Sequence, residues 1–503
     1  MNCIKFCRYL LGSLLVATLM SCGNFLEESS YDLVTPVTTE HYKELLQGEG
    51  YFRDVFRHGW FVEAMTDNFE VLNGTGAFIN ERARQFSQAF KWQADLELLS
   101  ENQTFVDNFY MHMYRNIFVA NTCLLALDKS DGKPEEKAVL RGQALFTRAY
   151  AYFCLANLYA QAYNEASPDE LCVPLVMEST PTTKKFTRAT IKDVWSLIKN
   201  DIQQSVENLK DSEISSIYEI NYRAALLLAS RISLFMEDYN SVIQYGEKYL
   251  ALSSNLYDIS GITQRPTRFD PKSVSPFLSF PSNVEIAFSF GVNNNSNYET
   301  CFIPTMNYYG SIDVMSGASK ELLTLYTEND KRSLWFTLKG PMSRYSNPMA
   351  VPLKFISTMS GDLRTQNMRT AEVYLNLSEA YLLGNHDQQR CLNMLNQLRK
   401  NRIANYVELT LSNFATESSL LDMLKNERRR ELCFEEFHRW WDLRRQGQPE
   451  IIHNWLDKER YVLHNKDLGY ILNFPKKELE FNDELLKQQN IRPERVPERI
   501  TQN

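Results

Sequence analysis

The chain of 503 residues lacks a hydrophobic run that could cross a membrane. Its apolar N-terminal stretch, Leu10–Met20, is shorter than the ~20 residues that a spanning helix needs, and no later segment is apolar enough. Positive charge is also in deficit, with 54 Lys and Arg against 62 Asp and Glu and a net charge of −8. An acidic chain of this kind argues against nucleic acid as a partner.

Patterns of common catalytic and metal sites are missing as well. The sequence contains no GxSxG, no HExxH and no glycine-rich phosphate loop. It has no CxxC pair and no Cys/His cluster, and His438 and His453 have no partners at ligand spacing. We therefore expect no cofactor, no metal ion and no catalytic residues.

Cysteine is sparse, with nine residues, of which seven follow residue 21. Four of them lie within apolar helical patterns: Cys123, Cys154, Cys391 and Cys433. We interpret these as small buried hydrophobic residues, with disulfide bonds as the alternative.

A linker rich in proline, glycine or serine is absent, so residues 22–503 are predicted to form a single domain. Irregular stretches are expected at about residues 59–100 and 253–362. The second holds eight of the 17 prolines and the polar run 293–297. Long ordered loops of this kind usually carry function.

Helical periodicity dominates much of what remains, including residues 105–127, 140–158 and 190–209, the last with Thr190 as its N-cap. Residues 225–250 read as two short antiparallel helices that join at Glu237-Asp238, and residues 368–398 as a second pair that joins at Gly384-Asn385. Such pairs are typical of tetratricopeptide units. Because about 150 residues separate the two pairs, a simple tandem solenoid is excluded.

The N-terminus reads as a bacterial lipoprotein signal. Lys5 and Arg8 precede the apolar stretch, and Leu19-Met20-Ser21-Cys22 matches a lipobox. We predict a signal peptide over residues 1–21 and a lipid on Cys22. The alternative is an ordinary secretory signal with a chance cysteine. Removing residues 1–21 takes away two cations and no acid, so the net charge becomes −10.

The densest cluster of charge and aromatics is Glu427 to Gly447, ERRRELCFEEFHRWWDLRRQG, with six arginines, five acids and two tryptophans. This stretch resembles a signature of the SusD/RagB family of nutrient-binding outer-membrane lipoproteins. Four further stretches resemble other segments of that family, in the family's order: 90–128, 141–160, 369–383 and 472–490. The resemblance covers most of the chain.

The resemblance implies a predominantly α fold, in which four tetratricopeptide-like helix pairs are interrupted by a large excursion of irregular loops and short strands. It also implies a lipid anchor in the outer membrane at the cell surface. The expected role is to capture an oligosaccharide and deliver it to a TonB-dependent transporter of the SusC/RagA type. A peptide ligand, as in the RagB branch, is one alternative. A structural lipoprotein without a ligand and a surface glycosidase are two others.

Ligands in this family meet aromatic and amide side chains on irregular loops. The resemblance therefore directs attention to loop residues that combine the two kinds, although each of them could instead pack on its own domain. The candidates are Trp60, Asn73, Asn297, Tyr298, Asn307, Tyr308 and Tyr309.

The arginine-rich stretch allows two interpretations, a buried ion-pair network and an anion site. We favour the network, with Glu372 and Glu379 pairing with arginines such as Arg429 or Arg430, because buried charges must find partners. Trp440 and Trp441 are expected in the core rather than as sugar platforms. Seven residues separate the two glutamates, about 10.5 Å along a helix, too far apart for a retaining glycosidase.

Overall fold

The computed structural model describes residues 36–52, 59–71, 87–100, 103–104, 108–180, 183–263, 283–291, 316–339, 349–352, 366–456 and 458–500. The predicted signal peptide and the predicted lipidation site Cys22 lie outside the described residues. No helix within the described ranges combines the length and apolar character needed to span a membrane.

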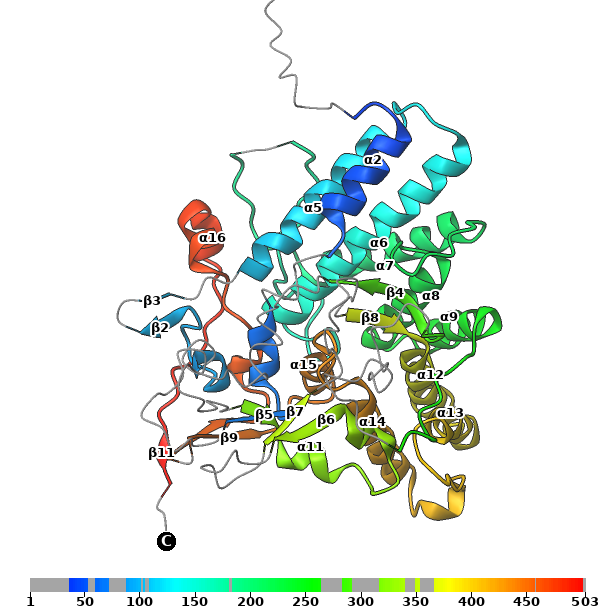
Figure 1. Cartoon of the computed structure of the whole chain (residues 1–503). Coiled ribbons are helices and arrows are strands. Elements are labelled where there is room, and N and C mark those ends of the chain that lie inside the picture. Colours follow the sequence, from blue (N-terminus) through cyan, green and yellow to red (C-terminus); the bar gives the residue numbers. More distant parts are fainter. Residues whose placement is uncertain are drawn as a thin grey trace, which may run out of the picture.

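Three long helices form one side of the scaffold: α5 (Asn108–Ala126), α6 (Pro134–Tyr159) and α7 (Ile191–Leu209), with α6 packed against both others (Figure 1). Pro134 is the first residue of α6, where its missing N–H is not needed. Thr190 caps α7 by accepting a hydrogen bond from the Asp193 amide at 3.1 Å, as the sequence predicts.

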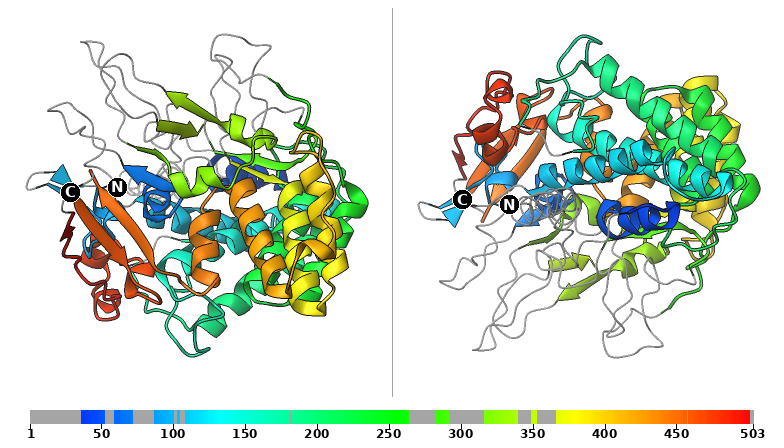
Figure 2. Two further views of the ribbon diagram at one scale, coloured as in Figure 1. Left: turned by 90° about the horizontal axis from the view of Figure 1, so that it is seen from below. Right: turned by 90° about the horizontal axis from the view of Figure 1, so that it is seen from above.

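The two predicted helix pairs are α8 (Tyr222–Phe235) with α9 (Tyr239–Leu252), and α12 (Thr370–Asn385) with α13 (Gln388–Lys400). They stack on each other through α9 and α12 despite their separation in sequence (Figures 1 and 2). Gly246 permits this approach, because a Cβ atom there would lie 2.7 Å from the Leu377 side chain. The chain therefore leaves the helical scaffold after α9 and returns to it at α12.

Short antiparallel ladders account for the strands. The ladder β1 (Phe69–Val71) with β5 (Ser316–Ala318) joins the two predicted irregular stretches. The others are β2 (Leu98–Ser100) with β3 (Gln103–Thr104), β4 (Ile286–Phe290) with β8 (Gln366–Arg369), β6 (Phe336–Lys339) with β7 (Met349–Pro352), and β9 (Ile451–Trp455) with β10 (Glu459–Leu463) and β11 (Glu498–Arg499).

Shorter helices connect these parts. Two of them, α14 (Glu417–Leu432) and α15 (His438–Arg445), carry the arginine-rich stretch. The remainder are α2 (Thr39–Leu45), η1 (Leu46–Gly50), η2 (Trp60–Met65), α11 (Lys320–Thr324), η3 (Lys331–Trp335), η4 (Leu411–Asn413), η5 (Leu468–Tyr470), α16 (Lys476–Phe481) and α17 (Asp483–Leu486).

One large hydrophobic core contains residues from Phe52 to Leu485, and both Trp440 and Trp441 are fully buried in it. The expectation of core tryptophans is confirmed. Cys123, Cys154, Cys391 and Cys433 are buried free thiols, so these four are not disulfide-bonded. The predominantly α fold with tetratricopeptide-like pairs and short-strand excursions is also confirmed.

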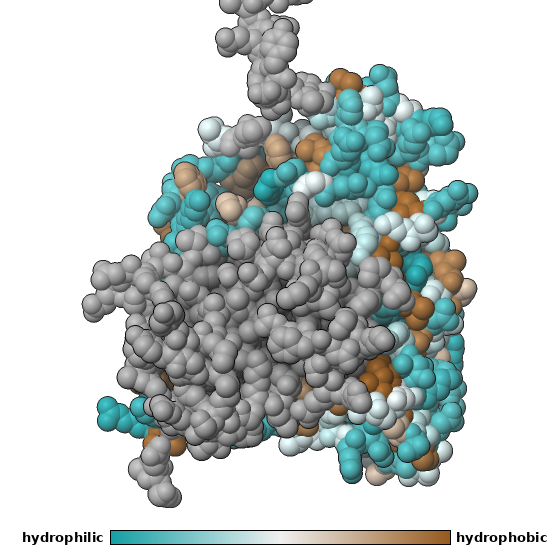
Figure 3. Space-filling view, viewed as in Figure 1, coloured by the Kyte–Doolittle hydropathy of each residue, from teal (hydrophilic) through white to brown (hydrophobic). Residues whose placement is uncertain are grey.

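The helix pairs lie at one end of the molecule, and α16 with strands β9 to β11 lies at the other (Figures 1 and 2). The described surface visible in Figure 3 is mainly hydrophilic, with apolar side chains scattered through it. The arginine-rich helices α14 and α15 lie between the two ends, where they contact both the scaffold and the excursions.

Candidate functional site

Of the candidate ligand residues, only Trp60 falls within the described chain, as the first residue of η2. Phe61, Val62 and Met65 of the same short helix are buried in the core. The other six candidates lie outside the described residues: Asn73, Asn297, Tyr298, Asn307, Tyr308 and Tyr309. Their ligand contacts stay predictions, so the site is built from the described residues that bound and hold these segments.

The β1–β5 ladder brings the two irregular stretches together. Val71, the last residue of β1, pairs with Ser316, the first residue of β5. Asn73 follows Val71 by two residues, and Tyr309 precedes Ser316 by seven. The chain therefore leaves β1 and enters β5 at the same end of one ladder.

The turn before β1 is held by two arginines of the arginine-rich stretch. Arg439 binds both carboxylate oxygens of Asp67 at 2.7 Å, and Arg429 donates to the Asp67 carbonyl and to Asn68 Oδ1 at 2.8 Å each. Burial alone would favour the neutral acid, but Arg439 and Arg429 outweigh it and hold the pKa of Asp67 down to about 2. These arginines therefore fix the turn Asp67-Asn68, which is called the loop base below.

Ser319 completes the same junction from the second stretch. Its hydroxyl donates to the Asp67 carbonyl at 2.6 Å, and its amide donates to the Asn68 carbonyl at 2.7 Å. The hydroxyl also accepts from the Leu322 amide and so caps α11. One residue thus ties the turn before β1 to the helix that follows β5.

Glu63 lies in η2, three residues after Trp60, and is a buried carboxyl group. Burial raises its pKa to about 7, although Asn68 and Thr66 donate hydrogen bonds to it that act in the opposite direction. Below that pH the turn therefore contains a protonated acid. This places a titratable group within η2, the short helix that begins with Trp60.

His453 of β9 fixes the far side of the first stretch. Its ring stacks between Phe90 and Trp92, with centroid separations of 4.2 and 4.1 Å. Its Nδ1 and Nε2 atoms lie 2.8 and 3.0 Å from the carbonyl oxygens of Phe90 and Thr66. Burial lowers the pKa of His453 to about 4, against the two carbonyl contacts, which favour the charged ring. It serves structure rather than metal binding.

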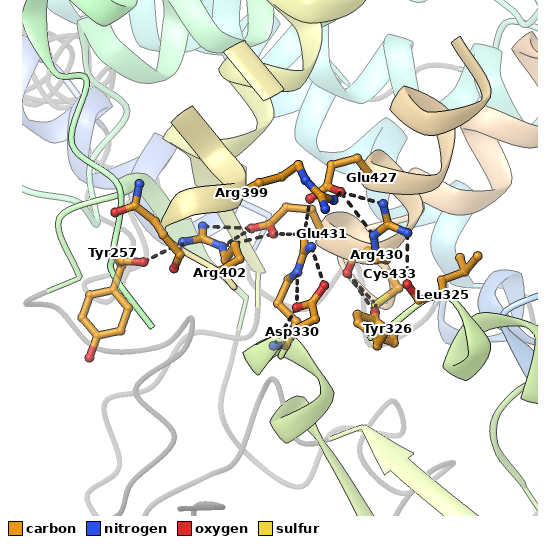
Figure 4. Close-up of polar contacts among 12 residues, drawn as sticks. Tyr257, Leu325, Tyr326, Asp330, Arg399, Arg402, Glu427, Arg430, Glu431 and Cys433 are labelled. Carbon is orange, nitrogen blue, oxygen red and sulfur yellow. Dashed lines mark hydrogen bonds and ion pairs between the residues drawn. The ribbon is translucent and has the colours of Figure 1, made fainter. Parts of the chain in front are cut away.

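A buried ion-pair network anchors the second stretch to the scaffold (Figure 4). Arg332 of η3 contacts Asp330 and Glu427 at 2.7 Å and Glu431 at 2.9 Å. Arg369 contacts Glu285 just before β4 at 3.1 Å and Glu431 at 2.6 Å.

Further arginines complete this network. Arg402 joins Glu285 and Glu431 at 2.6 and 3.0 Å. Burial disfavours ionisation of Glu431, but Arg402, Arg369 and Arg332 hold its pKa well below the ordinary value. Figure 4 shows Glu427 and Glu431 facing Arg399, Arg402 and Arg430. The network interpretation of the arginine-rich stretch is confirmed.

The partners expected for Glu372 and Glu379 were wrong. Glu372 binds Arg231 of α8 through both oxygens at 2.7 and 2.6 Å, and Glu379 binds Arg445. Arg429 pairs instead with Asp67, and Arg430 with Glu427 at 2.7 Å. The reason is geometric. Glu372 and Glu379 lie on the faces of α12 that contact α8 and α15, whereas Arg429 points toward Asp67.

Sequence reasoning missed Arg231, Glu285 and Asp67. Arg231 is fully buried in the apolar run of α8, and a lone arginine in such a helix is a signal for a buried partner. Glu285 and Asp67 lie in irregular segments, where no periodicity marks them. Nothing in the local sequence identifies either one.

The chemistry available to these groups is limited. Glu372 and Glu379 each have both oxygens on an arginine, so neither is placed as a general acid or nucleophile. Within the described ranges no three His, Cys, Asp or Glu side chains gather as a metal site. The ion pairs described above therefore hold the turn before β1 and the segments around β4 and η3 in place.

Comparison with known families gives the architecture a context. A family model described as "Starch-binding associating with outer membrane" matches residues 25–234, and a second, described as "SusD family", matches residues 291–492. The two matches together span most of the chain.

The chain belongs to the SusD/RagB family.

Solved structures agree on the SusD fold. A SusD superfamily protein of Bacteroides thetaiotaomicron has a TM-score of 0.70 at 18% identity and covers 91% of this chain and 100% of its own. A SusD-like carbohydrate binding protein of Bacteroides vulgatus has a TM-score of 0.66 at 20% identity, with 91% and 98% covered. One from Bacteroides fragilis has a TM-score of 0.66 at 19% identity, with 89% and 99% covered. No curated protein matches in sequence. At these identities the likeness establishes the fold.

Membership in the SusD/RagB family gives the coarse function. The family description is of starch binding in association with the outer membrane, so this is a nutrient-binding type of protein. In this SusD-family chain, the arginine-rich signature holds the bases of both excursions.

Proposed function

We propose that the protein is a lipid-anchored protein of the cell surface that captures an oligosaccharide and delivers it to a TonB-dependent outer-membrane transporter of the SusC type. The observation that supports this most is the match to a family described as starch-binding and outer-membrane-associated. The proposed anchor is a lipid on Cys22, behind a signal peptide of residues 1–21.

The proposed ligand surface is formed by both excursions. Its residues are Trp60, Asn73, Asn297, Tyr298, Asn307, Tyr308 and Tyr309. Sugar rings present C–H faces that pack on aromatic side chains, and hydroxyls that pair with amides. The β1–β5 ladder supports a shared surface, because Val71 and Ser316 bound the two candidate segments and are paired. The network around Glu431 supports a rigid base under them.

Delivery to a transporter accounts for the combination of an anchor with a binding surface. A binding protein alone concentrates its ligand, and uptake requires a channel partner. The single domain proposed for residues 22–503 would then present its loops toward that partner. The role we propose is non-catalytic, consistent with the ion pairing of Glu372 and Glu379.

A titration with a panel of ligands tests the proposal. Isothermal calorimetry would compare oligosaccharides, beginning with starch fragments because the family description names starch, with peptides of similar length. We expect saturable oligosaccharide binding, unchanged oligosaccharide after prolonged incubation, and co-purification of a transporter from membranes. Binding of peptides alone would favour the RagB-like alternative. Hydrolysis of the oligosaccharide would contradict a pure binding role.

A further inference from the structure

A cavity of about 140 Å³ lies among the helices of the scaffold, and none of its lining residues belongs to either excursion. The loop after α6, the end of α8 with its turn to α9, and helices α12, α14 and α15 surround it. An apolar cavity of roughly 150 Å³ holds one benzene molecule, so this one has room for an aliphatic side chain. Its apolar wall consists of Leu234, Phe235, Leu383 and Leu421.

One ion pair in the wall of this cavity is already complete. Arg445 donates to both carboxylate oxygens of Glu379 and, through Nε, to Asp442 at 2.9 Å. Burial alone would lower the pKa of Arg445, but the two carboxylates hold it above its ordinary value. The guanidinium group also lies over the Phe235 ring, 5.2 Å from its centre. Arg445 and Glu379 therefore shape the wall and leave little charge for a ligand.

Two further charged side chains line the cavity and lack such partners. Lys425 of α14 and Glu237 of the α8–α9 turn form no ion pair with any residue that the structure describes. Glu237 accepts one hydrogen bond, at Oε1 from the Asn164 amide at 3.1 Å. The same amide donates to the Arg445 carbonyl at 2.8 Å, which fixes Glu237 beside the cavity. The cavity thus presents one cation and one anion next to an apolar wall.

The backbone of Glu237 supports a role for its side chain. Its φ is +56°, in the left-handed region that favours glycine or asparagine. Residues held in such conformations concentrate at functional sites. The turn of the second helix pair has His386 at a φ of +54°, so this conformation does not itself require a carboxylate.

We propose that this cavity binds a small zwitterion, a free α-amino acid with an aliphatic side chain such as leucine. Lys425 binds its carboxylate, Glu237 binds its ammonium group, and the apolar wall takes its side chain. Both polar contacts are charge-assisted hydrogen bonds. A neutral sugar ring fits less well, because it carries no charge for the two free groups and the Phe235 ring is already covered by Arg445. The site is separate from the proposed ligand surface and does not depend on it.

Ligand-observed NMR titration of the full chain tests the proposal with three probes of one aliphatic shape. L-Leucine carries both charges, 4-methylvalerate carries only the carboxylate, and 3-methylbutylamine carries only the ammonium group. We expect saturable binding of leucine with a Kd on the order of 1 mM or below. Each of the other two probes should bind roughly tenfold more weakly, as expected for one lost charge-assisted hydrogen bond.

Two variants separate the two charges. Lys425→Gln should weaken leucine and 4-methylvalerate roughly tenfold and should not weaken 3-methylbutylamine. Glu237→Gly should weaken leucine and 3-methylbutylamine roughly tenfold and should not weaken 4-methylvalerate. Its Tm should be no lower than that of the wild type, because glycine adopts a positive φ without strain.

Two matched controls accompany these variants. His386→Gly changes the corresponding turn of the second helix pair, and Lys477→Gln changes an exposed residue of α16 at the other end of the molecule. Both should bind all three probes as the wild type does. The proposal is overturned if the wild type shows no saturable binding of leucine, or if Lys425→Gln and Glu237→Gly bind it as tightly as the wild type. Binding of glucose but not of leucine, lost in Glu237→Gly, would also overturn it and would identify a sugar site instead.

Discussion

Glu63 shows how strongly the fold perturbs a single side chain at the base of the first excursion. Its folded-state pKa is about 7 because the carboxyl group is buried, against an ordinary value of 4.5. The folded chain therefore holds a proton that the unfolded chain releases near pH 4.5. The free energy of unfolding contributed by this residue falls as pH rises from about 4.5 to about 7.

Replacing Glu63 by Gln should remove this dependence. The amide keeps an acceptor oxygen for Thr66 and Asn68 and carries no charge to bury. At pH 8 we expect the variant to exceed the wild type in stability by on the order of 1–3 kcal/mol, and by much less at pH 5. Urea unfolding at the two pH values measures this. The exposed Glu480→Gln should show no such difference, and an equal gain for Glu63→Gln at both pH values would contradict the assignment.

At the scale of elements, α14 is the piece that joins scaffold and excursions. Glu427 and Glu431 are four residues apart and so lie on one face of the helix, toward Arg332. Arg428 leaves on another face toward Asp442 at 2.8 Å, and Arg429 leaves toward the loop base at Asp67. One helix thus contributes charges to three separate ion-pair contacts, two of them buried.

Glu431→Ala should be strongly destabilising. It removes the carboxylate shared by Arg332, Arg369 and Arg402 and leaves buried cations short of a partner. We expect a loss of roughly 3–5 kcal/mol in the free energy of unfolding, measured by urea denaturation. Asp422→Ala on the exposed side of the same helix is the control and should change stability by under ~0.5 kcal/mol. Similar stability for both variants would show that the network contributes little.

Much of this architecture could be predicted at the level of elements. Thr190 marks the start of α7, and the break at Glu237-Asp238 separates α8 from α9, because caps and turns are local signals. The second break falls at His386-Asp387, two residues after the predicted Gly384-Asn385, which are the last residues of α12. Ion-pair partners are not local. Arg231 and Glu372 are 141 residues apart in sequence, and their contact depends on α8 packing against α12. The sequence indicated a buried ion pair for Glu372, but it missed Arg231 and could not assign the partner.

The candidate site was less accessible to prediction. The family resemblance directed attention to both excursions, and the β1–β5 pairing joins them. No sequence pattern pointed to that ladder, because strands of three residues carry almost no alternation signal. The same holds for Ser319 and Asp67, which hold the junction through backbone and side-chain contacts.

For the whole molecule, the proposed role requires an anchor. Cys22→Ala should leave the protein without lipid and release it from the outer membrane, because more than one acyl chain is needed for stable anchoring. Mass spectrometry of the mature N-terminus and fractionation of cells measure the two effects. A wild-type N-terminus found at another residue and without acyl chains would contradict the lipid anchor.

The most direct test of the whole account is calorimetric titration of the cognate oligosaccharide into the wild type, Asn73→Ala, and the double variant Tyr308→Ala/Tyr309→Ala. If both excursions contribute to one ligand surface, each variant should weaken binding roughly ten- to thirtyfold, as expected for the loss of contacts of about 1–2 kcal/mol. The account predicts a Tm within about a degree or two of the wild type, since substitutions away from the core usually change stability little. Wild-type affinity in both variants would contradict the account.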